Sequence, residues 1–309
     1  MQRLLSGKLI RSPHDTPLGD RLYYADRGKR HLVQRYDRLH LYGFSSTEVV
    51  AITYEELLTY RLAGPIPLSW PATAWDNPPR DRTIDLREVT TSKLRGSGIE
   101  FGAGTSPLGV PLECDVRFAD FVPEDALKAR SYAAQGMDFV PLSYVMGMED
   151  MSCIADGSLD FVIAVHVIEH LRNPLRALEQ ASRKLRPGGY LALIVPDKTR
   201  SFDRDRDLTS LDHLVSDYEH PSAERDLDHY FDFFSKAIGF TDPSVPLEIR
   251  VRNAVANNED LHFHTWTYAS FQAMVDYSAQ RIAPWKSVWS QPAVEGPEGF
   301  EEFYFVLGR

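Results

Sequence analysis

Residues 158–189 read SLDFVIAVHVIEHLRNPLRALEQASRKLRPGG. An apolar run of strand length occupies residues 161–165 and ends at the polar His166. A helix is predicted next, because Asn173 is a good N-cap residue, a proline follows it, and a glycine pair comes after the last helical residue. A second apolar run covers residues 190–195. Strand, helix and strand in this order predict a parallel crossover unit, in which ligands bind at the carboxyl ends of the strands.

A glycine-containing segment upstream predicts the other half of a ligand site. Residues 98–105 read GIEFGAGT, a short strand that runs into a turn, and Asp120 ends the next apolar stretch. Glycines let the backbone approach a ligand closely, and a carboxylate one strand over can accept both ribose hydroxyls. A tight structural turn would explain Gly102 and Gly104 alone, but the acid and the crossover unit favour a nucleoside site. Pro107 replaces the third glycine of a dinucleotide fingerprint, which disfavours NAD.

These motifs resemble those of the class I S-adenosylmethionine-dependent methyltransferases. The likeness runs through the glycine turn, Asp120, the two apolar strands and LRPGG at residues 185–189. It implies an α/β fold: a Rossmann-like sheet that binds S-adenosyl-L-methionine, with a helical lid insertion at about 198–265. Three further segments resemble a bacterial branch of this family that is associated with cell-surface polysaccharide and glycosyltransferase systems. They are PDK at 196–198, TSLDHL at 209–214 and HFHTWT at 262–267.

The resemblance also implies roles for single residues. The backbone of Gly102 and Gly104 would face the methionine carboxylate and the ribose, with Glu100 near the amino end. Asp120 would hold the ribose hydroxyls, and the backbone at His166 would line the sulfonium side.

The adenine contact departs from the family pattern. Residues 148–151 would flank the base, where relatives often place an aspartate at or just before position 148. This chain has Gly147 and Met148 there, so Glu149 or Asp150 is expected to replace it.

Composition narrows the partners. A formal net charge of −10 and a pI near 5.5 argue against non-specific nucleic-acid binding, which needs a basic surface. Two cysteines support neither a disulfide framework nor a cysteine metal site. The first ten residues lack a signal-peptide pattern, and no apolar run approaches the ~20 residues of a membrane span. A cytoplasmic location is expected.

The chain is predicted to have two domains. Residues 1–75 form a small N-terminal α+β module, 76–91 a proline-rich connector, and 92–309 the methyltransferase domain. The module is expected to contain a hairpin turning at Arg27 and Gly28, a helix ending at Gly43, and a helix capped by Thr53. The hairpin could contact a glycan or an acidic partner, or present a solvated face. Its basic and aromatic residues are Arg21, Tyr23, Tyr24, Arg27, Lys29, Arg30 and His31.

Later segments carry weaker signals. Helices are expected at 208–218, 223–238 and 270–279, and an antiparallel strand pair at 286–289 with 302–307.

A histidine is the natural base for removing a proton from a hydroxyl acceptor at neutral pH. His166 lies at a strand end, whereas His213 and His264 lie in segments expected to cover the site. His213 is the preferred base, because it could approach the acceptor from the face opposite the sulfonium. The pairs His166/His170 and His262/His264 suggest a metal, but neither has a third ligand at a fixed spacing. No metal is therefore predicted.

Three functions follow, from different classes. The first is O-methylation of a sugar hydroxyl in a surface glycan or its nucleotide-sugar precursor, beside a glycosyltransferase system. The second is a catalytically inactive binding module in polysaccharide assembly. The third, an NAD-linked oxidoreductase, is disfavoured by Pro107.

Overall fold

The computed structural model describes residues 7–13, 16, 21–33, 49–63, 86–111, 114–130, 139–240, 244–294 and 301–309. The chain divides into two compact units. The first comprises residues 1–79 and 87–146, and the second comprises 80–86 and 147–309. Most of the proline-rich connector and the helix expected to end at Gly43 lie outside the described residues.

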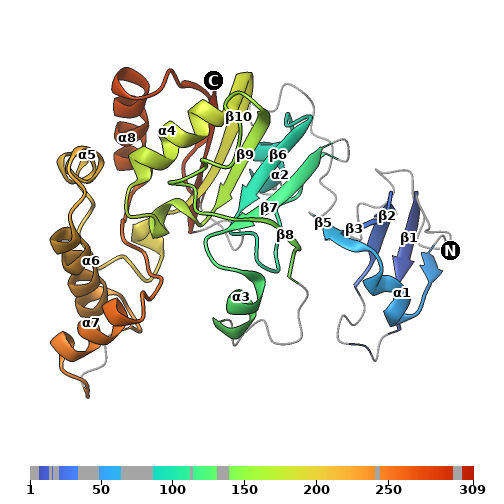
Figure 1. The fold of residues 1–309 in the computed structure, drawn as a ribbon, viewed down its shortest axis with the longest axis horizontal. Coiled ribbons are helices and arrows are strands. Elements are labelled where there is room, and N and C mark those ends of the chain that lie inside the picture. Colours follow the sequence, from blue (N-terminus) through green and yellow to red (C-terminus); the bar gives the residue numbers. More distant parts are fainter. Residues whose placement is uncertain are drawn as a thin grey trace. The chain divides into compact units, whose positions relative to one another are not determined.

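The N-terminal part of the first unit is a five-stranded sheet of order β4-β1-β2-β3-β5 (Figure 1). The predicted hairpin is confirmed: β2 and β3 pair antiparallel around Arg27 and Gly28, whose φ angles of 44° and 77° suit a tight hairpin turn. Thr53 caps the predicted helix by accepting from the N–H of Glu56. The elements are β1 (Lys8–Arg11), β2 (Tyr23–Asp26), β3 (Lys29–Leu32), β4 (Val49–Ala51), α1 (Tyr54–Leu58) and β5 (Arg61–Ala63).

Part of the basic and aromatic hairpin cluster is buried in this module. Tyr23, Arg30 and His31 are all less than 7% exposed. Arg30 donates to the carbonyl of Leu57 at 2.8 Å, and its guanidinium lies 5.5 Å from the centre of the Tyr23 ring. These three residues stabilise the module, so they are not available to a glycan on its surface.

Three parallel strands follow in the first unit. β6 (Ser97–Phe101) pairs with β7 (Asp115–Asp120), and β7 pairs with β8 (Leu142–Val145). Helices α2 (Leu86–Thr91) and α3 (Glu124–Arg130) accompany them.

The crossover unit predicted from residues 158–189 is confirmed in the second unit. The unit consists of β9 (Leu159–Val165), α4 (Pro174–Lys184) and β10 (Leu185–Pro196), and β10 is parallel to β9. α4 begins after Asn173, whose side chain accepts from the N–H of Arg176. Residues 161–164 are at most 1% exposed, as expected for a parallel strand covered on both faces. Gly189 is required, because a Cβ there would lie 2.9 Å from the carbonyl oxygen of Asp160.

The last two strands complete a mixed sheet. β12 (Glu302–Gly308) is antiparallel to both β10 and β11 (Lys286–Gln291), so the predicted strand pair is confirmed. The strand order is β11-β12-β10-β9-β6-β7-β8. This seven-stranded Rossmann-like sheet, with the small N-terminal sheet as a separate module, is the predicted fold class.

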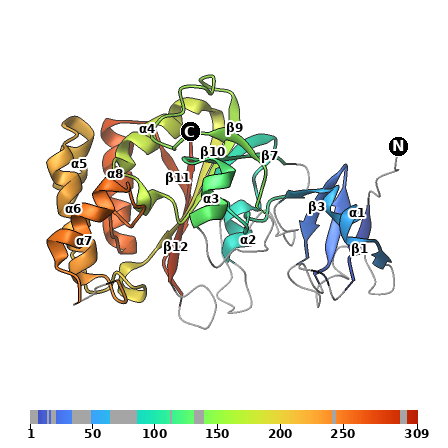
Figure 2. The same ribbon diagram turned by 60° about the horizontal axis from the view of Figure 1, so that its bottom comes forward.

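Two helices of the 198–265 insertion, α6 (Ala223–Lys236) and α7 (Leu247–Ala256), lie side by side in both views (Figure 2). α5 (Leu211–Glu219) and α6 (Ala223–Lys236) match the predicted helices, and α8 (Tyr268–Arg281) follows the insertion. The sequence reading missed α7 (Leu247–Ala256), which buries few of its own apolar residues. The insertion has its own hydrophobic core, formed by α6, α7 and the segment after α7. Its buried residues are Tyr230, Phe233, Phe234, Ala237, Val251, Ala254, Leu261 and Phe263.

None of the helices in the described parts of the chain is long and apolar enough to cross a membrane.

Candidate functional site

The glycine turn at the end of β6 leaves its backbone open. Gly102 and Gly104 have φ angles of 67° and 52°, in the left-handed region that favours glycine. A Cβ added at Gly104 would meet nothing within 4 Å, so the space beside this backbone is free in the first unit. The carbonyl of Gly104 accepts from the N–H of Val140 at 2.9 Å, which holds the turn in place.

Glu100 directs a buried carboxylate toward this turn. One carboxylate oxygen accepts from the N–H of Leu108 at 2.8 Å, and the other has no hydrogen-bond partner among the described residues. Burial raises the pKa of Glu100 to about 8. A buried acceptor with spare capacity fits a cationic amino group, such as that of S-adenosylmethionine.

Asp120 ends β7 and is 7% exposed. Its Oδ1 accepts from the N–H of Val122 at 3.3 Å, and its carbonyl accepts from the N–H of Met146 at 2.8 Å. The strand end and these two bonds orient the carboxylate. Glu100, Gly102, Gly104 and Asp120 therefore all lie at carboxyl ends of strands in the first unit, as predicted for a nucleoside site.

His166 follows β9 with a φ of 50°. Its Nε2 lies 2.8 Å from Oε2 of Glu302, whose other oxygen, Oε1, accepts from the hydroxyl of Tyr304. Because a carboxylate accepts, Nε2 carries the proton, and Nδ1 of the neutral ring holds a lone pair. The His166 side chain is 36% exposed, so a substrate can reach it.

Glu169 is 1% exposed and lies close to His166. Neither of its carboxylate oxygens has a hydrogen-bond partner among the described residues. Oε1 lies 3.8 Å from Nδ1 of His166 and 3.9 Å from Nε2 of His262. Both oxygens are buried, so a ligand does not reach them in this conformation.

The two candidates for the adenine contact differ. Glu149 accepts from the N–H of Asn173 at 2.5 Å and so holds the start of α4, and burial raises its pKa. Asp150 is exposed and accepts from the N–H of Ser152 at 3.0 Å. Hydrogen bonding to Ser152 lowers the pKa of Asp150. Asp150 is the more accessible of the two.

His213 and His264 come together in the insertion, with ring centroids 5.8 Å apart. The ring of His229, a histidine of the expected lid that was not among the three candidate bases, lies 4.8 Å from each of them, and Asp217 completes the group. Burial lowers the pKa of both His229 and His264, and the latter is fully buried. His166 belongs to a different set of contacts, with Glu302 and Glu169. The i, i+4 spacing of His213 and Asp217 is the one local signal for this cluster.

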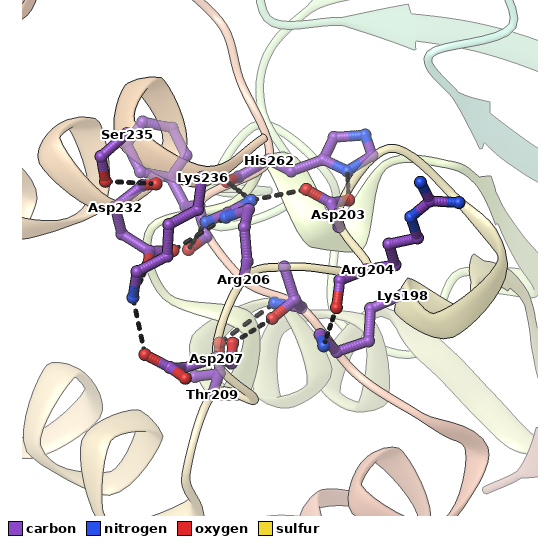
Figure 3. A network of polar contacts seen from close by, with 12 residues as sticks. Lys198, Asp203, Arg204, Arg206, Asp207, Thr209, Asp232, Ser235, Lys236 and His262 are labelled. Carbon is purple, nitrogen blue, oxygen red and sulfur yellow. Dashed lines mark hydrogen bonds and ion pairs between the residues drawn. The ribbon is translucent and has the colours of Figure 1, made fainter. Parts of the chain in front are cut away.

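A buried ion-pair network holds the 203–207 segment against α6 (Figure 3). Arg206 donates to Asp203, to Asp232 and to the carbonyl of His262, each at 2.8 Å. Nδ1 of His262 lies 2.5 Å from the second oxygen of Asp203. The network therefore ties three separate segments of the insertion together.

Comparison with known proteins agrees with this arrangement. A family model described as "Methyltransferase domain" matches residues 80–241. A ubiquinone biosynthesis O-methyltransferase from Xanthomonas oryzae pv. oryzae is 26% identical over 180 residues, which cover 56% of this chain and 69% of that relative.

Solved structures are more distant. A methyltransferase from Thermotoga maritima, described as a possible histamine N-methyltransferase, is 17% identical with a TM-score of 0.35, covering 69% of this chain and 81% of that one. One from Mesorhizobium loti is 11% identical with a TM-score of 0.41, covering 72% and 96%. The family match spans more than half of the chain and agrees with the strand order and the open glycine turn. The chain therefore belongs to the class I S-adenosylmethionine-dependent methyltransferases, and S-adenosyl-L-methionine is its expected cofactor.

Proposed function

We propose that this methyltransferase acts on a sugar hydroxyl, in a surface glycan or its nucleotide-sugar precursor. The observation that carries the proposal is the arrangement at the end of β9. There His166 is oriented by Glu302, and its side chain is 36% exposed, so a substrate can reach it. A sugar presents hydroxyl groups, one of which can lose its proton to His166. The relationship to an O-methyltransferase supports an oxygen acceptor, and the polysaccharide-associated motifs support a sugar.

In this proposal the cofactor is held by the residues that the sequence indicated. Glu100 faces the amino group of the methionine moiety. Gly102 and Gly104 leave room for the cofactor to contact their backbone, and Asp120 accepts hydrogen bonds from the ribose hydroxyls. Asp150 is the side chain available to the adenine. The bound cofactor supplies an electrophilic methyl group.

The chain's own residues then align and deprotonate the acceptor. His166 removes the hydroxyl proton at Nδ1, while Glu302 stabilises the imidazolium that results. The fully buried His264 cannot touch a substrate in this conformation, and His213 shares a cluster with two other histidines. We therefore assign the base to His166, although its position alone had suggested contact with the cofactor.

An inactive binding module is the second candidate. It is favoured by one observation, the commitment of Glu149 to the start of α4, which leaves a single acid for the adenine. Incubation with S-adenosylmethionine and a panel of nucleotide sugars and oligosaccharides separates the two. The enzyme should release S-adenosylhomocysteine and add one methyl group to a sugar oxygen, located by mass spectrometry. Cofactor binding without turnover on any hydroxyl acceptor would favour the binding module. Turnover confined to amine acceptors would contradict O-methylation.

Replacing Asp120 with alanine should weaken S-adenosylmethionine binding by about 1.5–3 kcal/mol, roughly 10- to 150-fold, because the ribose hydroxyls lose a charged acceptor. Calorimetric titration measures the affinity. Asp125→Ala, an exposed acid on α3, is the matched control and should bind normally. An unchanged affinity in a folded Asp120→Ala protein would remove this residue from the site.

Replacing Glu100 with glutamine should have opposite effects on stability and binding. The folded protein raises the Glu100 pKa from 4.5 to about 8, so stability from this group is fully present below pH 4.5 and is lost as pH rises through about 8. Glutamine cannot ionise, so the cofactor-free variant should melt above the parent at pH 8–9 and close to it near pH 5. Its cofactor affinity at pH 8–9 should fall, because the carboxylate charge that the parent carries there, facing the amino group, is gone. A difference in melting temperature that does not change with pH would refute this account.

A further inference from the structure

Four side chains of the insertion place metal-binding atoms around one point. His213 and Asp217 lie one turn apart on α5, His229 lies on α6, and His264 lies in the extended segment before α8. Each offers one ligand atom, and the four atoms all lie within 4.8 Å of one another. Such a set of three imidazoles and one carboxylate is typical of a zinc site.

The separations are close to those of a tetrahedral site. Nε2 of His213 lies 2.9 Å from Oδ2 of Asp217 and 3.1 Å from Nε2 of His229. Nε2 of His229 lies 4.0 Å from the same Asp217 oxygen. Ligand atoms about 2.0–2.1 Å from a tetrahedral Zn²⁺ are separated by roughly 3.3 Å. The His213 separations are already close to this value, whereas the 4.0 Å pair and any pair near the 4.8 Å limit would shorten by about 0.7–1.5 Å when a metal binds.

Counting protons shows why a cation fits here. Nε2 of His264 donates to the carbonyl of Arg172, so Nδ1 of the neutral ring carries a lone pair. This Nδ1 is buried and has no hydrogen-bond partner among the described residues. His229 also donates to the backbone of Phe263. The cluster thus places the lone pairs of His229 Nε2 and His264 Nδ1 in the same small group as Nε2 of His213.

Hydrogen bonds from an imidazole to a backbone carbonyl also orient the histidine ligands of known kinds of metal site. A metal-bound imidazole donates its other N–H to a carbonyl or carboxylate, which fixes the ring and raises its basicity. His264 and His229 each have such a carbonyl.

We propose that His213, Asp217, His229 and His264 bind one Zn²⁺, which clamps α5, α6 and the segment before α8 together. Imidazole-rich sites select zinc and similar transition metals over Mg²⁺ and Ca²⁺, which prefer oxygen ligands. The four protein ligands fill a tetrahedral shell, so the role is structural. This inference goes beyond the proposed methyl transfer and does not depend on the identity of the acceptor.

Metal analysis of the untagged full-length protein tests the site. The parent should purify with one zinc per chain, and His213→Gln and Asp217→Asn should each lose it. His213 is half-buried, so its replacement perturbs packing least. Two matched controls should keep the zinc: His220→Gln, at the end of the same helix, and His170→Gln, in the neighbouring group formed with Glu169 and His262. Loss of zinc from the His170 variant, or its retention by both ligand variants, would overturn the proposal.

Cobalt substitution and melting provide a readout that does not depend on activity. Protein stripped with a chelator should melt at a lower temperature, and Zn²⁺ but not Mg²⁺ should restore it. Co²⁺ should give the visible absorption of a tetrahedral site in the parent and in the His220 variant, and not in the His213 variant. If stripped protein shows neither stabilisation by Zn²⁺ nor a cobalt spectrum, the cluster is a hydrogen-bonded group of histidines and the metal proposal is wrong. Methyl transfer in such a protein would still be tested separately by S-adenosylhomocysteine release.

Discussion

Replacing His166 with asparagine is expected to lower turnover by about two to four orders of magnitude, the range for a lost general base. Cofactor affinity should stay within a few-fold of the parent, because the proposed binding groups at β6 and β7 are unchanged. Asparagine is the sharper choice over alanine, since residue 166 has a φ of 50° and asparagine tolerates this region well. Turnover is measured with saturating cofactor and acceptor, and affinity by titration calorimetry.

Two comparisons make this result specific to the base. Glu302→Gln keeps an acceptor for Nε2 of His166 but removes the charge, so turnover should fall by less than in His166→Asn. His170→Asn changes a nearby histidine that bonds to Asp260, and it should have little effect. If His166→Asn turns over within a few-fold of the parent, alignment alone or another group carries the catalysis.

Replacing Arg206 with methionine should lower the free energy of unfolding by about 3–5 kcal/mol, the cost of removing one partner from a buried ion pair. The Arg206 and Asp203 side chains are only 1% and 2% exposed, so the aspartate would stay buried with His262 and the Ser201 hydroxyl as its remaining side-chain partners. Contacts with Asp232 and with the Phe233 ring would be lost as well. Urea unfolding followed by circular dichroism measures the change.

Arg204→Met is the matched control, because Arg204 is 62% exposed and its ion pair with Asp205 spans 3.9 Å. Its effect should stay within about 0.5 kcal/mol. Adding Asp203→Asn to Arg206→Met should recover part of the loss, since no buried charge is then left unpaired. A parent-like stability of Arg206→Met would show that the network contributes nothing.

The effect of Arg206 should also depend on pH. Burial raises the pKa of Asp203, but the hydrogen bonds from His262 and Arg206 outweigh it and hold the pKa below its ordinary value. Such a group contributes stability above the unfolded-state pKa of 3.8, and this is lost as pH falls through the lower folded value. The difference between parent and Arg206→Met should therefore be full at neutral pH and shrink in strong acid.

Local sequence determined the elements whose own residues show an apolar run, a helix cap or a glycine turn. The β9–α4–β10 unit was predictable because two apolar runs flank a helix with an N-cap at Asn173 and glycines after its end. The glycine turn and the position of Asp120 were predictable for the same reason. Left-handed backbone favours glycine, and the end of a strand is indicated by an apolar run followed by a polar residue. α7 was missed because its sequence has little amphipathic pattern and most of its surface stays exposed.

Tertiary structure alone decided which distant side chains meet. Glu302 pairs with His166 across 136 positions, and His264 reaches His213 and His229 only because the insertion folds back on α5 and α6. Spacing along the chain predicted no metal, and it gave no sign that His213, Asp217, His229 and His264, the proposed zinc ligands, come together from three segments. The physical reason is that the sequence carries local propensity and hydrophobic pattern directly. The partners of a buried polar group depend instead on how whole elements pack, which no short window of residues contains.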